Sequence, residues 1–172
     1  MVNIDKNNIN KLLKNFLANY VEALYFVLET PCKQDEELEL NKNEGHFVFH
    51  NKVYYIDGCS NELISQILND DLDILCNTGL VRFGFGTHSN NFEIFISKYN
   101  VVSIYGDHEK NDEILKMSNI NKLDQFITAW ETFSQNSPGE TIVNIKNGKD
   151  VNFLLNKYKQ YGIYFGEIVN GS

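Results

Sequence analysis

The sequence predicts an α+β fold in a single domain, with an antiparallel sheet of five to seven strands and helices packed mainly on one face. First, three runs of strand-forming residues lie between residues 79 and 106, and their short connections force antiparallel pairing. Second, segments with helical spacing of apolar residues lie before and after this central meander. Third, the strands are too clustered for the strand–helix alternation of a parallel sheet, so a Rossmann-like fold is not expected.

The N-terminal segment predicts one long amphipathic helix over residues 5–29. Asp5 is a good N-cap residue, and apolar residues recur after it at intervals of three and four. The apolar stripe is too broad for a coiled-coil seam, so we expect this helix to pack on the sheet. Pro31 ends it, because the residue before a proline avoids helical geometry.

The next two segments predict an exposed connection and a hairpin. Residues 33–45 are charged and end in glycine, which is typical of a loop or a short exposed helical turn. Residues 46–57 predict a β-hairpin with Asn51 and Lys52 at its tip, because asparagine tolerates the left-handed backbone of a two-residue turn.

Ser60 predicts the N-cap of a second helix. Its apolar face consists of Leu63, Ile64, Ile67 and Leu68. A short strand or turn is expected over residues 73–77, ahead of the meander. In the first strand of the meander, alternation places Val81, Phe83 and Phe85 on one face.

The remaining chain predicts five elements. They are a polar loop over 106–113, a helix over 122–133, a strand over 141–145, a helix capped by Asp150 and a terminal strand over 161–169. Trp130, the only tryptophan, falls on the apolar stripe of the helix over 122–133. A core position is the simpler interpretation, and an interface anchor is the alternative, because tryptophan is enriched at interfaces.

Charge excludes some classes of partner. The formal net charge of −8 argues against nucleic acid, whose binding relies on Lys and Arg, and against anionic lipid. It favours a basic protein partner, although many acidic proteins are charged only for solubility. The chain has no apolar run near the ~18 residues of a membrane span, no signal-peptide pattern, and three cysteines without CxxC spacing. We therefore expect a soluble, cytoplasmic protein with reduced thiols.

The sequence contains no recognisable catalytic or cofactor motif. Gly84 and Gly86 come nearest to a phosphate loop, but such a loop opens onto a helix, whereas these glycines lead into another strand. Cys59 and His88 could pair as nucleophile and base, but a structural thiol is the simpler interpretation. We therefore predict no catalytic residue and no cofactor.

No metal site is predicted either. His46 and His50 are four residues apart on an expected strand, which places them about 13 Å apart along it. Two ligands of one ion must each lie within about 2 Å of the metal, so this pair cannot share an ion.

The span from Gly84 to Glu140 resembles small immunity proteins of bacterial polymorphic-toxin and contact-dependent growth inhibition systems. The likeness covers about a third of the chain and consists of an acidic α+β domain, a meander and a tryptophan-bearing helix. The resemblance implies a cytoplasmic, non-enzymatic protein that binds and blocks a toxin, often a basic nuclease. The family shares no catalytic residues, so no residue here gains a role from it.

Two acidic segments are the candidate contact surface for a basic toxin domain. Their residues are Asp35, Glu36, Glu37, Asp107, Glu109, Asp112 and Glu113. A second hypothesis is a small-molecule-binding protein or an enzyme, with a pocket between sheet and helices. The residues expected to line that pocket are Tyr54, Phe85, His88 and Tyr105. A third is a homo-oligomer that pairs through an exposed strand.

Overall fold

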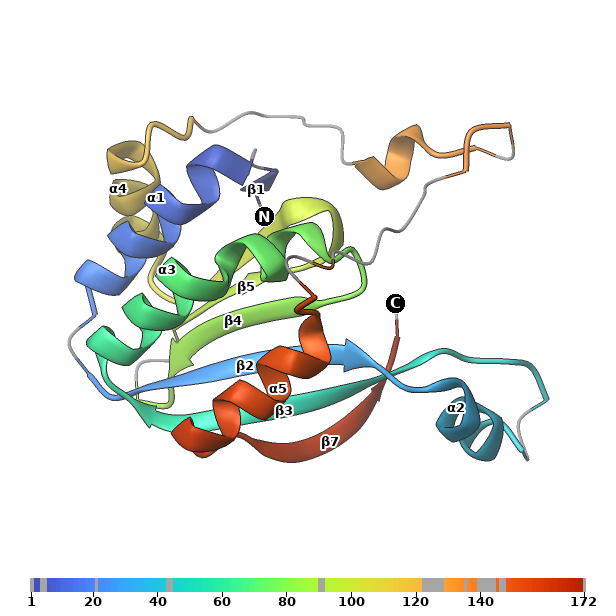
Figure 1. Cartoon of the computed structure of the whole chain (residues 1–172). Coiled ribbons are helices and arrows are strands. Elements are labelled where there is room, and N and C mark those ends of the chain that lie inside the picture. The colour runs from blue at the N-terminus through green and yellow to red at the C-terminus, as the bar shows by residue number, and fades with distance from the viewer. Residues whose placement is uncertain are drawn as a thin grey trace.

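The computed structural model describes residues 2–3, 6–20, 22–42, 45–89, 92–121, 129–134, 136–138, 145 and 148–171. Its strands form one seven-stranded antiparallel sheet in the order β1-β6-β5-β4-β2-β3-β7 (Figure 1). The strands are β1 (Val2–Asn3), β2 (Leu24–Pro31), β3 (His50–Cys59), β4 (Arg82–Thr87), β5 (Glu93–Ile96), β6 (Val101–Tyr105) and β7 (Tyr164–Asn170). The predicted α+β class with an antiparallel sheet is confirmed, and β4, β5 and β6 form the predicted meander.

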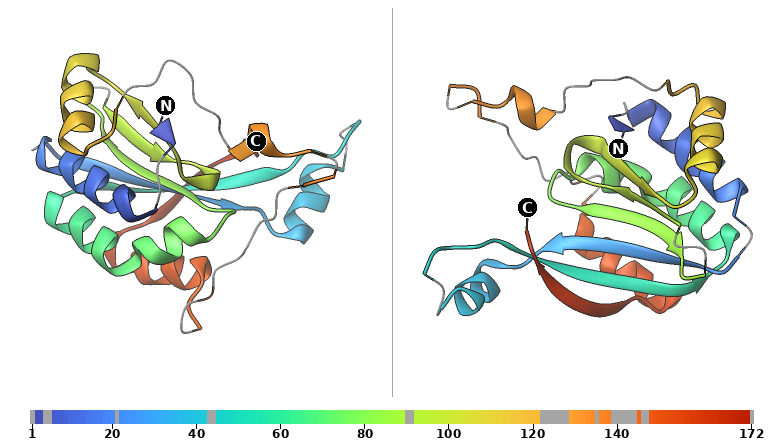
Figure 2. Two further views of the ribbon diagram at one scale, coloured as in Figure 1. Left: turned by 90° about the horizontal axis from the view of Figure 1, so that it is seen from above. Right: turned by 180° about the vertical axis from the view of Figure 1, so that it is seen from behind.

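Three of the helices cover one face of this sheet. The helices are α1 (Lys6–Ala18), α2 (Gln34–Leu40), α3 (Asn61–Asn77), α4 (His108–Met117) and α5 (Val151–Tyr158). Helices α1, α3 and α5 pack on the same face, α4 lies beside α1 at one end, and α2 lies beyond the other end (Figures 1 and 2). No helix of the described residues is long and apolar enough to cross a membrane.

The core lies between these helices and the sheet. On α1, the predicted apolar stripe is fully buried, including Leu12, Leu13 and Phe16. The Phe16 ring stacks on Phe92 with a centroid distance of 5.5 Å, and Phe92 lies edge-on to Phe85 of β4 at 6.3 Å. Apolar burial of this kind is the main favourable term in folding, so the stripe explains why α1 docks here.

The prediction of one helix over residues 5–29 is wrong in its second half. The helix ends at Ala18, and Leu24–Pro31 form β2, which pairs with both β3 and β4. The run from Leu24 to Leu28 is apolar throughout, so the spacing of its apolar residues fits a buried strand as well as a helix. Strand pairing on both sides and burial of Phe26 and Leu28 against the helices decide in favour of the strand.

The predicted hairpin with Asn51 and Lys52 at its tip is also wrong. Strand β3 continues through both residues, which pair with Pro31 and Thr30 of β2 on one side and with β7 on the other. The chain reverses instead through α2 and the segment after it. A strong two-residue turn needs a glycine after the asparagine, and here a lysine stands in that position. The weak turn preference of Asn-Lys is therefore outweighed by pairing with β2 and β7.

Helix α3 begins where it was predicted but is longer. The Ser60 hydroxyl accepts a hydrogen bond from the Leu63 backbone N–H at 3.3 Å, which confirms the N-cap. The separate strand or turn expected over 73–77 is wrong, because the helix continues to Asn77. Asp71 is buried in this helix and accepts hydrogen bonds from Lys157 Nζ at 2.7 Å and Tyr158 Oη at 3.0 Å, which compensate its burial.

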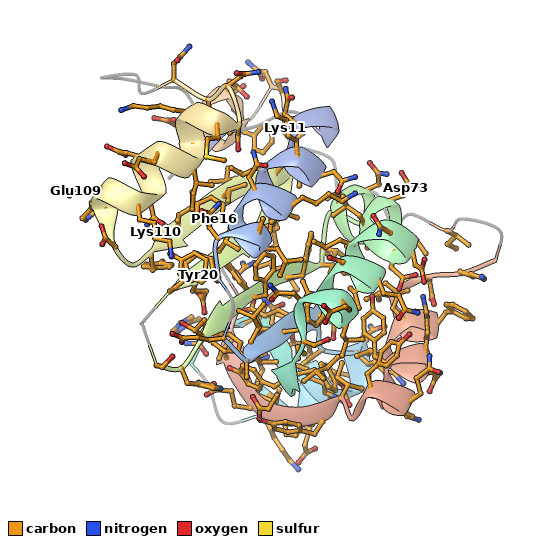
Figure 3. The ribbon with its side chains drawn as sticks, turned by 90° about the vertical axis from the view of Figure 1, so that its left-hand side faces the viewer. Lys11, Phe16, Tyr20, Asp73, Glu109 and Lys110 are labelled. Atoms are coloured by element: carbon orange, nitrogen blue, oxygen red, sulfur yellow. The ribbon has the colours of Figure 1, made fainter. Side chains whose placement is uncertain are left out.

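The polar segment 106–113 is largely helical, which corrects its prediction as a loop. Asp107 caps α4, and its carboxylate accepts from the backbone N–H groups of Glu109 and Lys110. Lys110 Nζ lies 3.7 Å from the centroid of the Tyr20 ring, while Glu109 points away into solvent (Figure 3). This cation–π contact helps hold α4 beside α1.

Two of the C-terminal predictions are confirmed, although the terminal strand begins at Tyr164 and not at Tyr161. Asp150 caps α5 by accepting from the Phe153 N–H at 3.0 Å, and β7 forms the terminal strand. Most of the helix predicted over 122–133, the Trp130 side chain and most of the strand predicted over 141–145 lie outside the described residues. Within the first of these segments, Ala129–Thr132 form a short 3-10 turn.

Candidate functional site

The face of the sheet opposite α1, α3 and α5 carries a cleft of about 810 Å³, and no described helix lies in front of that face (Figure 2). Residues alternate along β2, so Leu24, Phe26 and Leu28 face the core while Tyr25, Val27 and Glu29 line the cleft. The polar character of the lining comes from two sets of side chains. They are the tyrosines Tyr25, Tyr55, Tyr105 and Tyr164 and the carboxylates Glu29, Asp57, Glu93 and Glu167.

Strand register brings residues from distant parts of the chain into one row. Tyr105 of β6 is opposite Glu93 of β5, Glu93 is opposite Gly86 of β4, and Gly86 is opposite Tyr25 of β2. In the next row on the same face, Tyr55 of β3 lies opposite Val27 of β2 on one side and Tyr164 of β7 on the other. The cleft is therefore assembled from six strands, β2 to β7, whose order in the sheet differs from their order in the sequence.

Two glycines make room for the aromatic rings of the cleft. A Cβ atom built on Gly86 would lie 2.7 Å from Tyr25 Oη, and one on Gly166 would lie 2.6 Å from Tyr55 Cε2. Both distances are too short for a real side chain, so the rings occupy the space above these glycines. Gly86 belongs to a strand that leads into another strand, as the sequence indicates, and its lack of a side chain makes room for both the Phe92 carbonyl oxygen and Tyr25.

Hydrogen bonds connect the tyrosines with the carboxylates. The Tyr25 hydroxyl donates to Glu93, and the Tyr164 hydroxyl donates to Asp57 at 2.6 Å. His88 Nε2 lies 3.3 Å from the second oxygen of Asp57, and its ring lies 4.8 Å from that of Tyr25. Tyr55 and Tyr164 are 6.0 Å apart between ring centroids. These contacts form one continuous polar and aromatic cluster across β2, β3, β5 and β7.

The environment of this cluster shifts the pKa values of its members. Partial burial, together with the neighbouring Glu93, raises the pKa of Tyr25. Hydrogen bonds from Tyr164 and His88 lower the pKa of Asp57 below its ordinary value. At neutral pH the cleft therefore holds protonated phenols and an ionised carboxylate.

The substitution Tyr164→Phe is expected to raise the pKa of Asp57 toward its ordinary value, because the hydrogen bond from Tyr164 is the largest cause of the shift. A depressed folded-state pKa means that ionised Asp57 stabilises the fold above its unfolded-state pKa, and that this contribution is lost as pH falls through the folded-state value. Carboxyl NMR titration measures the shift. Tyr54→Phe, on the helix-covered face, serves as a control, and an unchanged Asp57 pKa in Tyr164→Phe would contradict the assignment.

One end of the cleft is partly neutralised. Arg82 Nη1 lies 3.3 Å from Glu29 Oε2, and both side chains are largely buried. Asn51 Nδ2 donates to the same oxygen at 3.4 Å. Among the described residues, Glu93 and Glu167 have no cation within ion-pair distance, and Asp57 has only His88 beside it. The uncompensated negative charge therefore lies toward Asp57, Glu93 and Glu167.

The structure does not bring the two predicted acidic segments together. Asp35, Glu36 and Glu37 lie on α2, whereas Asp107, Glu109, Asp112 and Glu113 lie on α4, at opposite ends of the molecule (Figure 1). Three of them have structural partners. Glu37 is only 6% exposed and binds the backbone N–H and the ring Nδ1 of His50, Glu36 pairs with Lys52, and Asp107 caps α4. The rest are exposed.

The predicted pocket set divides between the two faces of the sheet. His88 and Tyr105 line the cleft. Phe85 is fully buried in the core, and Tyr54 packs edge-on against Phe165 on the helix-covered face. Sequence reasoning missed Tyr25, Asp57 and the remaining lining residues, mainly because it assigned Tyr25 to a helix and Asp57 to the end of a hairpin. Alternation along β2 is the signal that reveals them.

The thiol and metal alternatives gain no support from the geometry. Cys59 is buried, and burial raises its pKa to about 11, so it is a poor nucleophile at neutral pH. Among the described residues, no three His, Cys, Asp or Glu side chains are grouped so that they could hold a metal ion. Comparisons of the chain with protein-family models, curated proteins and solved structures found no match.

Proposed function

We propose that this protein is a non-enzymatic binding protein of the immunity type, which binds and neutralises a basic bacterial toxin domain in the cytoplasm. The observation that carries the proposal is the sheet face in front of which no described helix lies (Figure 2). Its cleft is lined by tyrosines and carboxylates, with no lysine or arginine among its described lining residues. Tyrosine is enriched at the energetic centres of protein interfaces. Carboxylates complement a basic partner and accelerate its approach.

This face differs from the contact surface expected from sequence. The acidic residues of α2 and α4 are split between the two ends of the molecule, and Glu37 is already occupied by His50. The cleft combines exposed aromatic area, which suits an interface anchor, with negative charge, which complements a cationic protein. The formal charge of −8 of the whole chain adds long-range attraction to such a partner.

The proposal is tested with the product of the neighbouring gene, produced as an isolated domain. If that product is a basic toxin, we expect a one-to-one complex whose association rate falls as salt is raised, because screening weakens attraction between charged surfaces. Co-expression should restore growth of cells that produce the toxin. Failure to form a complex, together with undiminished toxicity on co-expression, would contradict the proposal.

A small-molecule-binding protein or an enzyme is the second candidate. The cleft volume of about 810 Å³ falls within the range of small-molecule sites. The His88–Asp57 pair also resembles the pairs in which a carboxylate orients a histidine that acts as a general base. However, His88 is 74% exposed, so little of the protein excludes water from it. Native mass spectrometry of the purified protein distinguishes the candidates, since a retained small molecule in the cleft favours the second.

A further inference from the structure

We infer that the cleft binds an arginine side chain of the partner, with the guanidinium group placed among Tyr25, Asp57, Glu93 and Tyr164. The source of this arginine, a basic toxin, rests on the proposed function. The cleft and its preference for a planar cation follow from the residues of this chain alone.

The aromatic part of the cleft suits a flat cation. The rings of Tyr25 and Tyr55 are 6.5 Å apart between centroids, and those of Tyr55 and Tyr164 are 6.0 Å apart. Because Gly86 and Gly166 have no side chains, two of these rings lie across the sheet surface instead of standing away from it. A cation near such ring faces is attracted by their negative electrostatic potential.

The carboxylates provide acceptors for the N–H groups of the ligand. A carboxylate has about four lone-pair sites. Glu93 accepts from Tyr25, and Asp57 accepts from Tyr164 and contacts His88, so both retain acceptor capacity. The cleft therefore offers more acceptors than its own donors use.

The distribution of charge determines which end of the cleft receives the cation. At the Glu29 end, Arg82 already satisfies the carboxylate and would repel a second guanidinium. At the other end, Asp57 and Glu93 are joined through Tyr25 and His88. The geometry therefore favours a cation at the second end.

Arginine fits this site better than lysine. Its guanidinium is planar, stacks on aromatic rings and donates hydrogen bonds in a fixed fork to carboxylates. A lysine ammonium is a compact, strongly hydrated charge that cannot stack in this way. A cleft with both ring faces and carboxylates therefore distinguishes the two cations.

The test uses three neutral-background peptides of nine residues, with three arginines, three lysines or three glutamines at the same positions. Calorimetry of the full-length protein at low ionic strength measures binding. We expect the arginine peptide to bind about tenfold more tightly than the glutamine peptide and severalfold more tightly than the lysine peptide. Equal binding of the arginine and glutamine peptides would overturn the inference.

A matched pair of double variants locates the binding site. Asp57→Asn/Glu93→Gln removes two charges from the cleft and keeps acceptors for the two tyrosine hydroxyls, and we expect it to weaken arginine-peptide binding about tenfold. Glu62→Gln/Asp70→Asn removes the same charge from the exposed surface of α3, and we expect less than a twofold change. Equal weakening in both would show a general charge effect and would overturn the inference.

An NMR measurement on the wild-type protein and a comparison of peptide binding with toxin binding separate failure of the arginine site from failure of the proposed function. The ring signals of His88 in wild-type protein should shift when the arginine peptide binds, which tests the site even if the cleft variant folds poorly. Peptide binding without a toxin complex would leave the cleft assignment intact and refute the proposed function. A toxin complex with unchanged affinity in the cleft variant would support the function and overturn the arginine site.

Discussion

Phe26→Ala is expected to lower the free energy of unfolding by about 3–5 kcal/mol, the usual cost of removing a buried phenylalanine ring. Phe26 is 0% exposed and lies on β2, where it is opposite both Ile56 and Phe85. Its ring packs edge-on against Tyr158 of α5 at 5.8 Å. Alanine would leave a cavity between the sheet and the helices, and the surrounding elements cannot close it without breaking strand pairs.

The control for this prediction is Phe47→Ala. Phe47 is 54% exposed and contacts the Phe49 ring, so the same chemical change should alter stability by about 0.5 kcal/mol or less. Urea denaturation measures both variants. In a chain of this length, the Phe26→Ala cost corresponds to a fall of about 10 °C in Tm. Similar losses in the two variants would show that β2 does not lie in the core.

Gly84→Ala is expected to destabilise the fold by about 1–3 kcal/mol, the range typical of overpacking. The new Cβ would lie 2.3 Å from the Ile94 carbonyl oxygen and 3.0 Å from Phe95 Cα. Both atoms belong to the backbone of β5, which is paired with β4 and β6 and cannot move away without losing hydrogen bonds. The strain should therefore appear as a lower midpoint of denaturation.

Gly45→Ala serves as the control for this substitution. No atom lies within 4 Å of the position that its Cβ would occupy, in the described structure. Replacing such a glycine stiffens the unfolded chain, so stability should stay the same or rise slightly. If Gly84→Ala were as stable as Gly45→Ala, the close approach of β5 to β4 would be refuted.

The candidate site was only partly predictable. Residues such as His88 and Tyr105 could be nominated because they flank the turns of a recognisable meander. Tyr25 could not, because its segment has the apolar spacing of a helix as well as the character of a buried strand. The carboxylates of the cleft lie on strands far apart in sequence, and only their pairing in the sheet makes them neighbours.

Acidic runs in the sequence suggested a contact surface, but the strongest run has other partners in the folded chain. Glu37 is buried against His50, and Glu36 pairs with Lys52, so both help attach α2 to β3. A sequence shows that a segment is charged, whereas burial and pairing decide whether that charge is free to meet another protein.

The sequence by itself determined the α+β class, the antiparallel meander and the helix starts at Ser60 and Asp150. These features depend on short-range physics: side-chain caps bond to N–H groups within three residues, and short connections force adjacent strands to run antiparallel. The tertiary structure alone decided that residues 24–31 form a strand and that residues 50–59 form a single one. Both stretches gain pairing and burial from strands far away in sequence, and that gain exceeds their local preferences.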